Sequence, residues 1–305
     1  SDATKGWVPL EDDVTALEAV APPTQKAIFG YGATSSYVSM TNLVNSSGVV
    51  ATDTTGVGTA RRELAATGYG GDKAIFGYGF TGSKVSMTNL VSNNGVVAAD
   101  VTGVGTARQR LAAASYGGDK GLFGYGENSG KISATNLVSN SGVVATDTTG
   151  VGTARQYLAA TNYGGNKAIF GYGETSSYIS ATNLVSNSGV VATDTTGVGT
   201  ARARLEAASY GGDKAIFAYG FTGSNVSMSN LVSNTGVVSA DVTGVGTNRY
   251  GLGAASYGGD KAIFGYGWTG AYVSMTNLVS NSGVVAADVT GVGTARRYSA
   301  AAGYS

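Results

Sequence analysis

The residues of this chain with the most distinctive chemistry recur at a constant spacing of 47 positions. An aspartate stands eight residues before an arginine in each of six copies, as Asp53 and Arg61 show in the first. Oxygen-only cation sites need about six to eight ligands, and one aspartate with its flanking threonines supplies too few. We therefore expect each aspartate to form an Asx turn, with an Asp–Arg contact that ties neighbouring units together.

Catalytic chemistry has few candidate groups here because the chain contains no histidine and no cysteine. Disulfides and thiolate metal sites are excluded, and general acid–base catalysis would rest on Asp, Glu, Lys or Tyr. Glu206 stands where other copies carry alanine or glycine, and we expect a solvated residue at a channel mouth. The near-identity of the copies also makes a single asymmetric pocket hard to build. We expect no enzymatic activity, no cofactor and no metal.

The sequence GDKAIFGYG at 71–79 returns with small changes in later copies, and its lysine marks the repeat. The six lysines are Lys26, Lys73, Lys120, Lys167, Lys214 and Lys261. No insertion or deletion interrupts the spacing, so the array extends from residue 26 to residue 305. A fixed period of this length is typical of repeat proteins, whose core grows along the stack.

Each unit contains four stretches with the composition of β strands, separated by Gly, Asn, Ser and Asp clusters that are typical of turns. In the first unit they are KAIFGYG (26–32), YVSMTNLV (37–44), GVVATDTT (48–55) and RRELAATGYG (61–70). Four strands in a repeat of about 40 to 50 residues indicate a β-propeller. We predict an all-β fold, a six-bladed β-propeller with four antiparallel strands per 47-residue blade. A β-solenoid is the alternative.

Read from its arginine, the unit GTARRELAATGYGGDKAIFGYGFTGSKVSMTNL resembles a kelch repeat. The resemblance covers residues 26–305 and implies that the arginine-led stretch is the innermost strand, followed outward by the other three. The chain then begins with the second strand of a blade and ends with a lone first strand, RRYSAAAGYS (296–305). We therefore expect the C-terminal strand to pair within the N-terminal blade, which closes the ring and removes free sheet edges.

Two short clusters differ among the copies, one after each GYG and one comprising the two residues after each arginine. In an up-and-down blade both clusters lie on one face of the disc, and the nearly invariant turns VSNSG and YGGD lie on the other. Aromatic side chains mixed with arginine favour a binding face, and neutral drift at tolerant turns is the alternative. The residues expected to form this face are Tyr37, Arg62, Phe80, Arg110, Tyr157, Tyr178, Arg204, Phe221, Tyr250, Trp268, Tyr272 and Tyr298.

Residues 1–25 lie outside the array and form an N-terminal arm. Val14 and Leu17 are at helical spacing within residues 11–21, which predicts a short amphipathic helix. Because such a helix is too short to be stable alone, it packs on the ring or docks on a partner. We expect docking, through Trp7, Val14 and Leu17.

Charge and hydropathy exclude two classes of partner. The chain has 19 basic and 19 acidic residues, so we expect no nucleic acid to bind. No apolar run approaches the roughly 18 residues of a membrane-spanning helix, and the first residues lack the pattern of a secretory signal. We expect no membrane insertion.

The runs KAIFGYG and TNLVSNSGVVATDTTGVGTAR are similar to repeat proteins of environmental tailed bacteriophages. This similarity implies a component of the virion, or an extracellular protein, that helps adsorption. We expect a non-enzymatic binding or assembly module that recognises a glycan, a cell-surface receptor or a protein through one face and attaches to a virion protein through its arm. Two alternatives remain open, a purely structural capsid or tail component and a hydrolase that uses Asp and Glu at the channel mouth.

Overall fold

The computed structural model describes residues 25–305, and every regular element in this range is a β strand. Across residues 25–305, eighteen strands form six separate three-stranded antiparallel sheets. The prediction of an all-β repeat fold is confirmed. Within the same range no helix has the length and apolar character needed to cross a membrane. The expected docking residues Trp7, Val14 and Leu17, with their expected helix, lie outside the described residues.

Each sheet takes one strand from the alanine-rich stretch, one from the KAIFG stretch and one from the TNLV stretch. The alanine-rich strands are β3 (Ala65–Tyr69), β6 (Ala112–Tyr116), β9 (Ala159–Tyr163), β12 (Glu206–Tyr210), β15 (Gly253–Tyr257) and β18 (Ala300–Tyr304). The middle strands are β1 (Lys26–Gly30), β4 (Lys73–Phe80), β7 (Lys120–Gly124), β10 (Lys167–Gly171), β13 (Lys214–Ala218) and β16 (Lys261–Gly265). The outer strands are β2 (Thr41–Val44), β5 (Lys84–Val91), β8 (Thr135–Val138), β11 (Thr182–Val185), β14 (Ser229–Val232) and β17 (Thr276–Val279).

The prediction of a fourth strand in each unit is wrong for the described residues. In the first unit the segment 48–55 bridges β2 at only two points, Val50 opposite Val44 and Thr54 opposite Thr41. Between these points the Asn42 amide donates hydrogen bonds to the Ala51 carbonyl at 3.0 Å and to Asp53 Oδ1 at 2.9 Å. The segment therefore runs beside the sheet, joined by a few backbone hydrogen bonds and by the Asn42 side chain instead of a continuous ladder.

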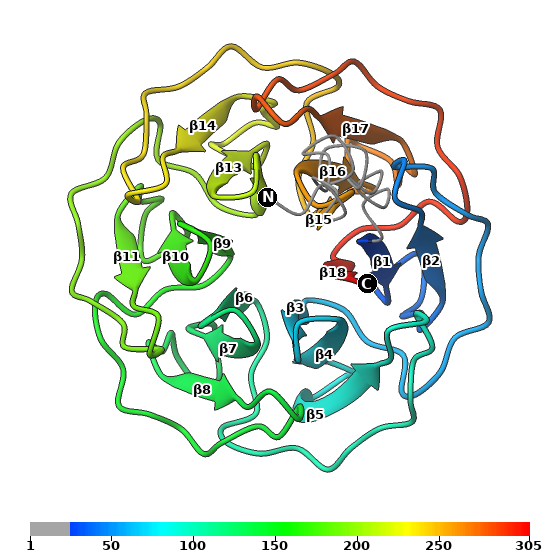
Figure 1. The fold of residues 1–305 in the computed structure, drawn as a ribbon, viewed down its shortest axis with the longest axis horizontal. Coiled ribbons are helices and arrows are strands. Elements are labelled where there is room, and N and C mark those ends of the chain that lie inside the picture. The colour runs from blue at the N-terminus through cyan, green and yellow to red at the C-terminus, as the bar shows by residue number, and fades with distance from the viewer. Residues whose placement is uncertain (1–24) are drawn as a thin grey trace, which may run out of the picture.

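The six sheets surround a common axis, with the alanine-rich strands nearest to it (Figure 1). Each inner strand contacts the inner strands of both neighbouring sheets, in the cyclic order β3, β6, β9, β12, β15 and β18. Strand β18 pairs with β1, from Lys26 opposite Tyr304 to Gly30 opposite Ala300. The last strand of the chain therefore completes the sheet that contains the first, as expected from the sequence.

The repeated FGYG motif packs each sheet against its neighbour. The Phe76 ring lies 5.1 Å from the Tyr31 ring, edge on, and a Cβ at Gly30 would stand 2.7 Å from Phe76 Cζ. A glycine at this position therefore lets the phenylalanine of the next sheet approach the backbone. One copy carries Ala218 instead, and there the Tyr219–Phe264 ring distance increases to 5.5 Å. The motif is explained by packing between sheets.

The repeated arginine is a buried anchor for the segment that leads into each inner strand. The Arg61 side chain is fully buried; its Nε donates to the Tyr78 carbonyl at 2.9 Å and its Nη2 to Asn89 Oδ1 at 2.6 Å. The guanidinium also lies 4.3 Å from the centre of the Tyr31 ring in the neighbouring sheet. Burying a cation is unfavourable unless its donors are satisfied, so this environment holds Arg61 in one position. The variable residues that follow are fixed by it.

The Asp–Arg contact exists and joins two neighbouring 47-residue units, but both groups lie beside the same sheet, so it does not tie adjacent sheets together. Arg61 Nη1 lies 3.8 Å from Asp100 Oδ1, whereas Asp53, eight residues before Arg61, pairs with Arg296. The Asp100 carboxylate also accepts hydrogen bonds from the Thr59 amide at 3.0 Å and the Thr59 hydroxyl at 2.6 Å. Each aspartate therefore joins two segments beside one sheet: the one that leads into the inner strand and the one that follows the outer strand.

Candidate functional site

The two variable clusters meet beside the ends of the inner strands. Beside each sheet the residue after the buried arginine bridges the residue after the GYG of the next unit, as Arg62 bridges Phe80 and Tyr250 bridges Trp268. The invariant turns meet one another at the opposite ends of the inner strands, where Asn93 donates to Asp72 at 3.3 Å. The structure thus brings the variable residues of all six units to one end of the axis.

The second residue after each buried arginine belongs to a circle of six residues around the axis, which we call the axial ring. The axial ring consists of Glu63, Arg110, Tyr157, Arg204, Gly251 and Tyr298. Each member donates its amide hydrogen to the carbonyl of the preceding member, with N···O distances of 2.7–3.3 Å. All six have φ between 53° and 65°, which costs a non-glycine residue about 1–2 kcal/mol. Only one member is glycine, so five side chains are kept at the axis despite this strain.

One side of the axial ring is a network of paired charges. Arg110 Nε donates to Glu63 Oε2 at 3.1 Å, and Arg110 Nη1 lies 2.5 Å from Glu127 Oε2. The Tyr157 hydroxyl donates to Glu63 Oε1 at 2.9 Å, while Lys84 Nζ lies 3.3 Å from Glu127. Burial, reinforced by the Glu63 charge, raises the pKa of Tyr157, so its hydroxyl stays protonated and donates to Glu63. This side is electrostatically satisfied.

The other side of the axial ring combines arginine with aromatic rings. The Arg204 guanidinium carbon lies 4.6 Å from the centre of the Tyr157 ring and 5.5 Å from that of Tyr250. Arg297 lies 4.6 Å from the Trp268 ring, and its Nη1 donates to the Tyr250 hydroxyl at 3.1 Å. Cation–π contacts of this kind contribute about 0.5–2 kcal/mol each, depending on solvation. They hold both guanidinium groups in place without neutralising them.

The remaining predicted residues extend the same surface outward. Arg62 lies 5.3 Å from the Tyr37 ring, the Tyr178 ring packs edge on against Phe221 at 6.2 Å, and Tyr272 packs against Trp268 at 4.8 Å. All twelve predicted binding residues are partly buried. The aromatic rings among them are only partly exposed, because they pack on one another and on arginine.

A cavity of about 40 Å³ lies directly behind the axial ring. Its wall includes five leucines and, at the sixth equivalent position, Ser299, whose buried hydroxyl has no hydrogen-bond partner among residues 25–305. Glu206 also lines this cavity, next to Leu205. Burial raises the pKa of Glu206 to about 8, so the carboxyl is mostly protonated at neutral pH. The expectation of a fully solvated residue is therefore corrected in part, because Glu206 is partly exposed while the cavity around its carboxyl disfavours the charged form.

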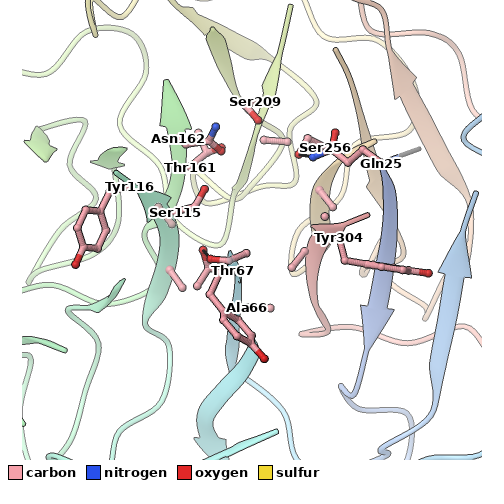
Figure 2. Close-up of a pocket in the computed structure, with 18 of the residues that line it drawn as sticks. Gln25, Ala66, Thr67, Ser115, Tyr116, Thr161, Asn162, Ser209, Ser256 and Tyr304 are labelled. Atoms are coloured by element: carbon pink, nitrogen blue, oxygen red, sulfur yellow. Dashed lines mark hydrogen bonds between the residues drawn. The ribbon is translucent and has the colours of Figure 1, made fainter. Parts of the chain in front are cut away.

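The opposite end of the axis holds a larger cavity of about 250 Å³ (Figure 2). Its wall consists mainly of alanines and small polar side chains, including Ser115, Asn162 and Ser209. Gln25 lies at this end, where its carbonyl accepts a hydrogen bond from the Gly258 amide at 2.8 Å and its side chain donates to Ser256 at 3.4 Å. Within residues 25–305, no arginine or tryptophan lines this cavity.

A second circle of backbone hydrogen bonds surrounds that end. One residue of each YGGD turn, or its equivalent, donates to the carbonyl of a residue in the next unit, at 2.7–3.0 Å. The donors are Gly70, Gly117, Gly164, Gly211, Gly258 and Ser305, and the acceptors are Asp119, Asn166, Asp213, Asp260, Gln25 and Asp72. Gln25 and Ser305 thus occupy the places of a turn aspartate and a turn glycine.

Sequence reasoning missed Arg297, Glu63, Glu127 and Ser299 as parts of this site. Arg297 has the same repeat position as Arg62, and this equivalence could have identified it. Ser299 replaces a leucine found in the other five copies, a signal of the same kind as Glu206. The contacts of Glu63 with Arg110 had no such signal because they cross from one unit to the next.

No protein-family model matches the chain, and no curated protein matches it significantly. Among residues 25–305 no three His, Cys, Asp or Glu side chains converge as a metal site. The geometry of the axial ring and its surroundings is therefore the observation that bears on function.

Proposed function

We propose that the six sheets are the blades of a closed six-bladed β-propeller related to the kelch type. The cyclic contacts of the inner strands, the pairing of β18 with β1 and the two circles of six backbone hydrogen bonds support this architecture. A β-solenoid would stack its coils into continuous parallel sheets, whereas the sheets here are separate and antiparallel.

We further propose that the protein is a non-enzymatic binding or assembly module, with the axial ring and its surrounding aromatic residues as the recognition surface. The observation that carries this proposal is the axial ring itself. Five of its six members keep varied, functional side chains in a backbone conformation that favours glycine. Neutral drift would not maintain arginine and tyrosine at such positions, because glycine there relieves strain.

A glycan of a cell surface is the ligand class that best suits this surface. Aromatic rings bind the apolar faces of sugars while arginine binds polar groups, and both occur together around Tyr250. The similarity of the repeat to phage repeat proteins supports a place in a virion or outside the cell, with residues 1–25 as the attachment to a virion protein. A purely structural capsid or tail component is the second candidate.

A hydrolase would need catalytic carboxylates, and two carboxyl groups, those of Glu63 and Glu206, line one cavity. A cavity of about 40 Å³ accommodates roughly three water molecules and no sugar. Glu63 is also engaged by Arg110 and Tyr157, which leaves it poorly placed as a nucleophile or base. These observations favour binding over hydrolysis.

The test is binding of the labelled full-length protein to a broad glycan array and to whole bacteria. It is compared with a triple variant, Phe80→Ala, Phe221→Ala, Trp268→Ala, and with a control that truncates three valines, each about 65% exposed, Val96→Ala, Val143→Ala, Val190→Ala. We expect the wild type and the valine control to bind and the still-folded aromatic variant to lose binding. Absence of wild-type binding, or unchanged binding by the aromatic variant, would refute the recognition role.

A further inference from the structure

The variable clusters carry an uneven distribution of charge. Their cationic residues are Arg62, Lys84, Arg110, Lys131, Arg204 and Arg297, and their acidic residues are Glu63, Glu127 and Glu174. Two of the acids are bound to Lys84 and Arg110 in the charge network described above. The third acid, Glu174, lies in the same unit as Arg204 and its charge acts on this arginine, although the two groups form no ion pair within 4.0 Å. Arg204 and Arg297 together still leave an excess of positive charge on this side of the axial ring.

Neither Arg204 nor Arg297 forms an ion pair within 4.0 Å in the described part of the chain. The Nε atoms of both side chains are buried and lack a hydrogen-bond partner among residues 25–305. Aromatic rings surround both groups instead, with Arg204 5.3 Å from the Phe221 ring and Arg297 5.1 Å from the Tyr298 ring. Two guanidinium groups are thus held rigidly, partly desolvated and without a carboxylate within 4.0 Å among residues 25–305.

Tyr250 joins these two arginines into one site. Its hydroxyl accepts the hydrogen bond from Arg297, and its ring packs under Arg204. Gly251 lies between Arg204 and Tyr298 in the axial ring, so this stretch of the ring has no side chain of its own. A Cβ at Gly251 would stand 3.1 Å from the Tyr298 ring, so the glycine is what allows that ring to lie there.

Planar guanidinium groups bind carboxylate and sulfate oxygens in a bidentate manner, and partial burial strengthens these hydrogen bonds. Aromatic rings next to them offer stacking surfaces for the adjoining sugar. We infer that Arg204 and Arg297, together with Tyr250, form a subsite for the carboxylate or sulfate group of an acidic glycan. This inference rests on the proposed recognition function and names the chemical class of its ligand.

The experiment measures binding of three small probes to the full-length protein by isothermal titration calorimetry. Methyl glucuronide supplies a carboxylate, glucose 6-sulfate supplies a sulfate, and methyl glucoside is the neutral control. Trp268 lies against Arg297, so its fluorescence in a Trp7→Phe background reports the same events at the site. The two acidic arms distinguish carboxylate from sulfate as the preferred group.

We expect at least one acidic probe to bind about tenfold or more tightly than methyl glucoside. Arg204→Gln and Arg297→Gln should each weaken that binding about tenfold, whereas Lys131→Gln, which removes an exposed charge from the same face, should change it less than about twofold. Arg297→Lys retains the charge without the planar fork and should give an intermediate loss. This conservative variant protects the test if a glutamine variant does not fold.

Equal binding of the acidic and neutral probes, or an equal effect of Lys131→Gln and Arg297→Gln, would overturn the inference. If the acidic probes do not bind while the aromatic variant still loses binding on the glycan array, the result supports the recognition function and contradicts the anionic subsite. If the wild type binds neither the array nor the bacteria nor the probes, the recognition function and the anionic subsite are both refuted.

Discussion

Glu206 and Ser299 line the same axial cavity, although they belong to different units and each replaces an apolar residue or glycine found in the equivalent positions. The Ser299 hydroxyl is buried without a partner among residues 25–305, and the Glu206 carboxyl is desolvated. Two departures from the repeat therefore coincide in space. Their combination makes the centre of the molecule polar where leucines would otherwise enclose it.

The raised pKa of Glu206 predicts a dependence of stability on pH. Its pKa is about 8 in the folded protein and has an ordinary value of 4.5, because burial disfavours the charged form. Between these values the unfolded chain has lost a proton that the folded chain retains, so the contribution of Glu206 to stability is greatest below pH 4.5 and falls as pH rises towards 8. The expected loss is about 3–5 kcal/mol in total.

Urea unfolding of the wild type and of Glu206→Gln at pH 5 and pH 9 measures this effect. The chain contains no histidine, so few other groups titrate in this range. The glutamine variant should show nearly equal stability at the two pH values, and Glu174→Gln should retain the wild-type difference. An unchanged pH dependence in Glu206→Gln would show that the carboxyl is solvated after all.

The contacts of the buried arginines predict that replacing one of them with lysine lowers the stability of the fold. Arg202 donates to the Tyr219 carbonyl at 2.9 Å and to Asn230 Oδ1 at 2.7 Å, and a single ammonium group cannot satisfy both directions. Arg202→Lys should lower the free energy of unfolding by about 3 kcal/mol. The control Arg62→Lys, at a partly buried variable position, should cost less than about 1 kcal/mol. Equal effects in chemical denaturation would contradict an anchoring role for Arg202.

The sequence predicted the three-stranded part of each sheet because its period is exact and its strands have strong β composition. It failed at GVVATDTT, whose β-branched residues suit a strand equally well. In that segment the Ala51 carbonyl accepts a hydrogen bond from the Asn42 side-chain amide, and the Asp53 carboxylate accepts one from the Thr294 backbone amide. The Asp–Thr hydrogen bonds join residues at least 41 positions apart and leave no local signal, so composition alone could not show that the ladder stops.

The candidate site was predictable in its location and not in its detail. The alternation of strands placed both variable clusters at one end, and the bridge between Arg62 and Phe80 is consistent with this. The axial ring was not predictable because its members adopt left-handed φ values, which Glu63 and Tyr157 do not favour intrinsically. Which side chains reach the axis depends on that backbone conformation.

The repeated aspartates predict cooperative loss of stability in acid. Partial burial acts to raise the pKa of Asp100, but hydrogen bonds from Thr59 and Asn89, with the Arg61 charge, outweigh it and hold the pKa below its ordinary value of 3.8. This stability is present above pH 3.8 and is lost as pH falls through the lower folded value. The other five equivalent carboxyls are also lowered, at Asp53, Asp147, Asp194, Asp241 and Asp288.

The measurement is unfolding free energy between pH 5 and pH 2 for the wild type and for Asp100→Asn. The variant should lose about 1–2 kcal/mol at pH 7, because hydrogen bonds to a charged acceptor are weakened. It should also show a shallower decline in acid, since one fewer group takes up a proton. An acid profile identical to that of the wild type would exclude Asp100 from this linkage.

The geometry of the axial ring predicts that a substitution there can abolish binding with little change in the free energy of unfolding. Tyr298→Gly relieves a left-handed conformation while removing the contact of its ring with Tyr157, whose centre lies 6.1 Å away. We expect a change in unfolding free energy below about 1 kcal/mol and a clear loss of glycan binding. Tyr78→Gly, at an invariant tyrosine with φ of 63° and no exposed surface, is the contrasting control and should cost about 3–5 kcal/mol. A similar cost for both changes would mean that Tyr298 is structural.

The positions of the two ends of the array predict that a circular permutant can be made with a linker of one residue. Tyr69 pairs with Lys73 across three turn residues, and Tyr304 pairs with Lys26 in the same register. Ser305 and Gln25 make the hydrogen bonds of the first and third turn residues, so one residue is missing between them. A single glycine joining Ser305 to Gln25 should therefore complete the sixth turn.

New ends are best opened after Gly118, an exposed turn glycine with open space around its Cβ position. If the six sheets form a closed ring, this permutant of residues 25–305 should fold cooperatively, with an unfolding free energy within about 1 kcal/mol of the linear chain 25–305. Direct fusion without the glycine should be less stable, because a two-residue turn cannot keep the register of the other units. A permutant that aggregates, or that folds only with a much longer linker, would place the two ends apart and refute the closed ring.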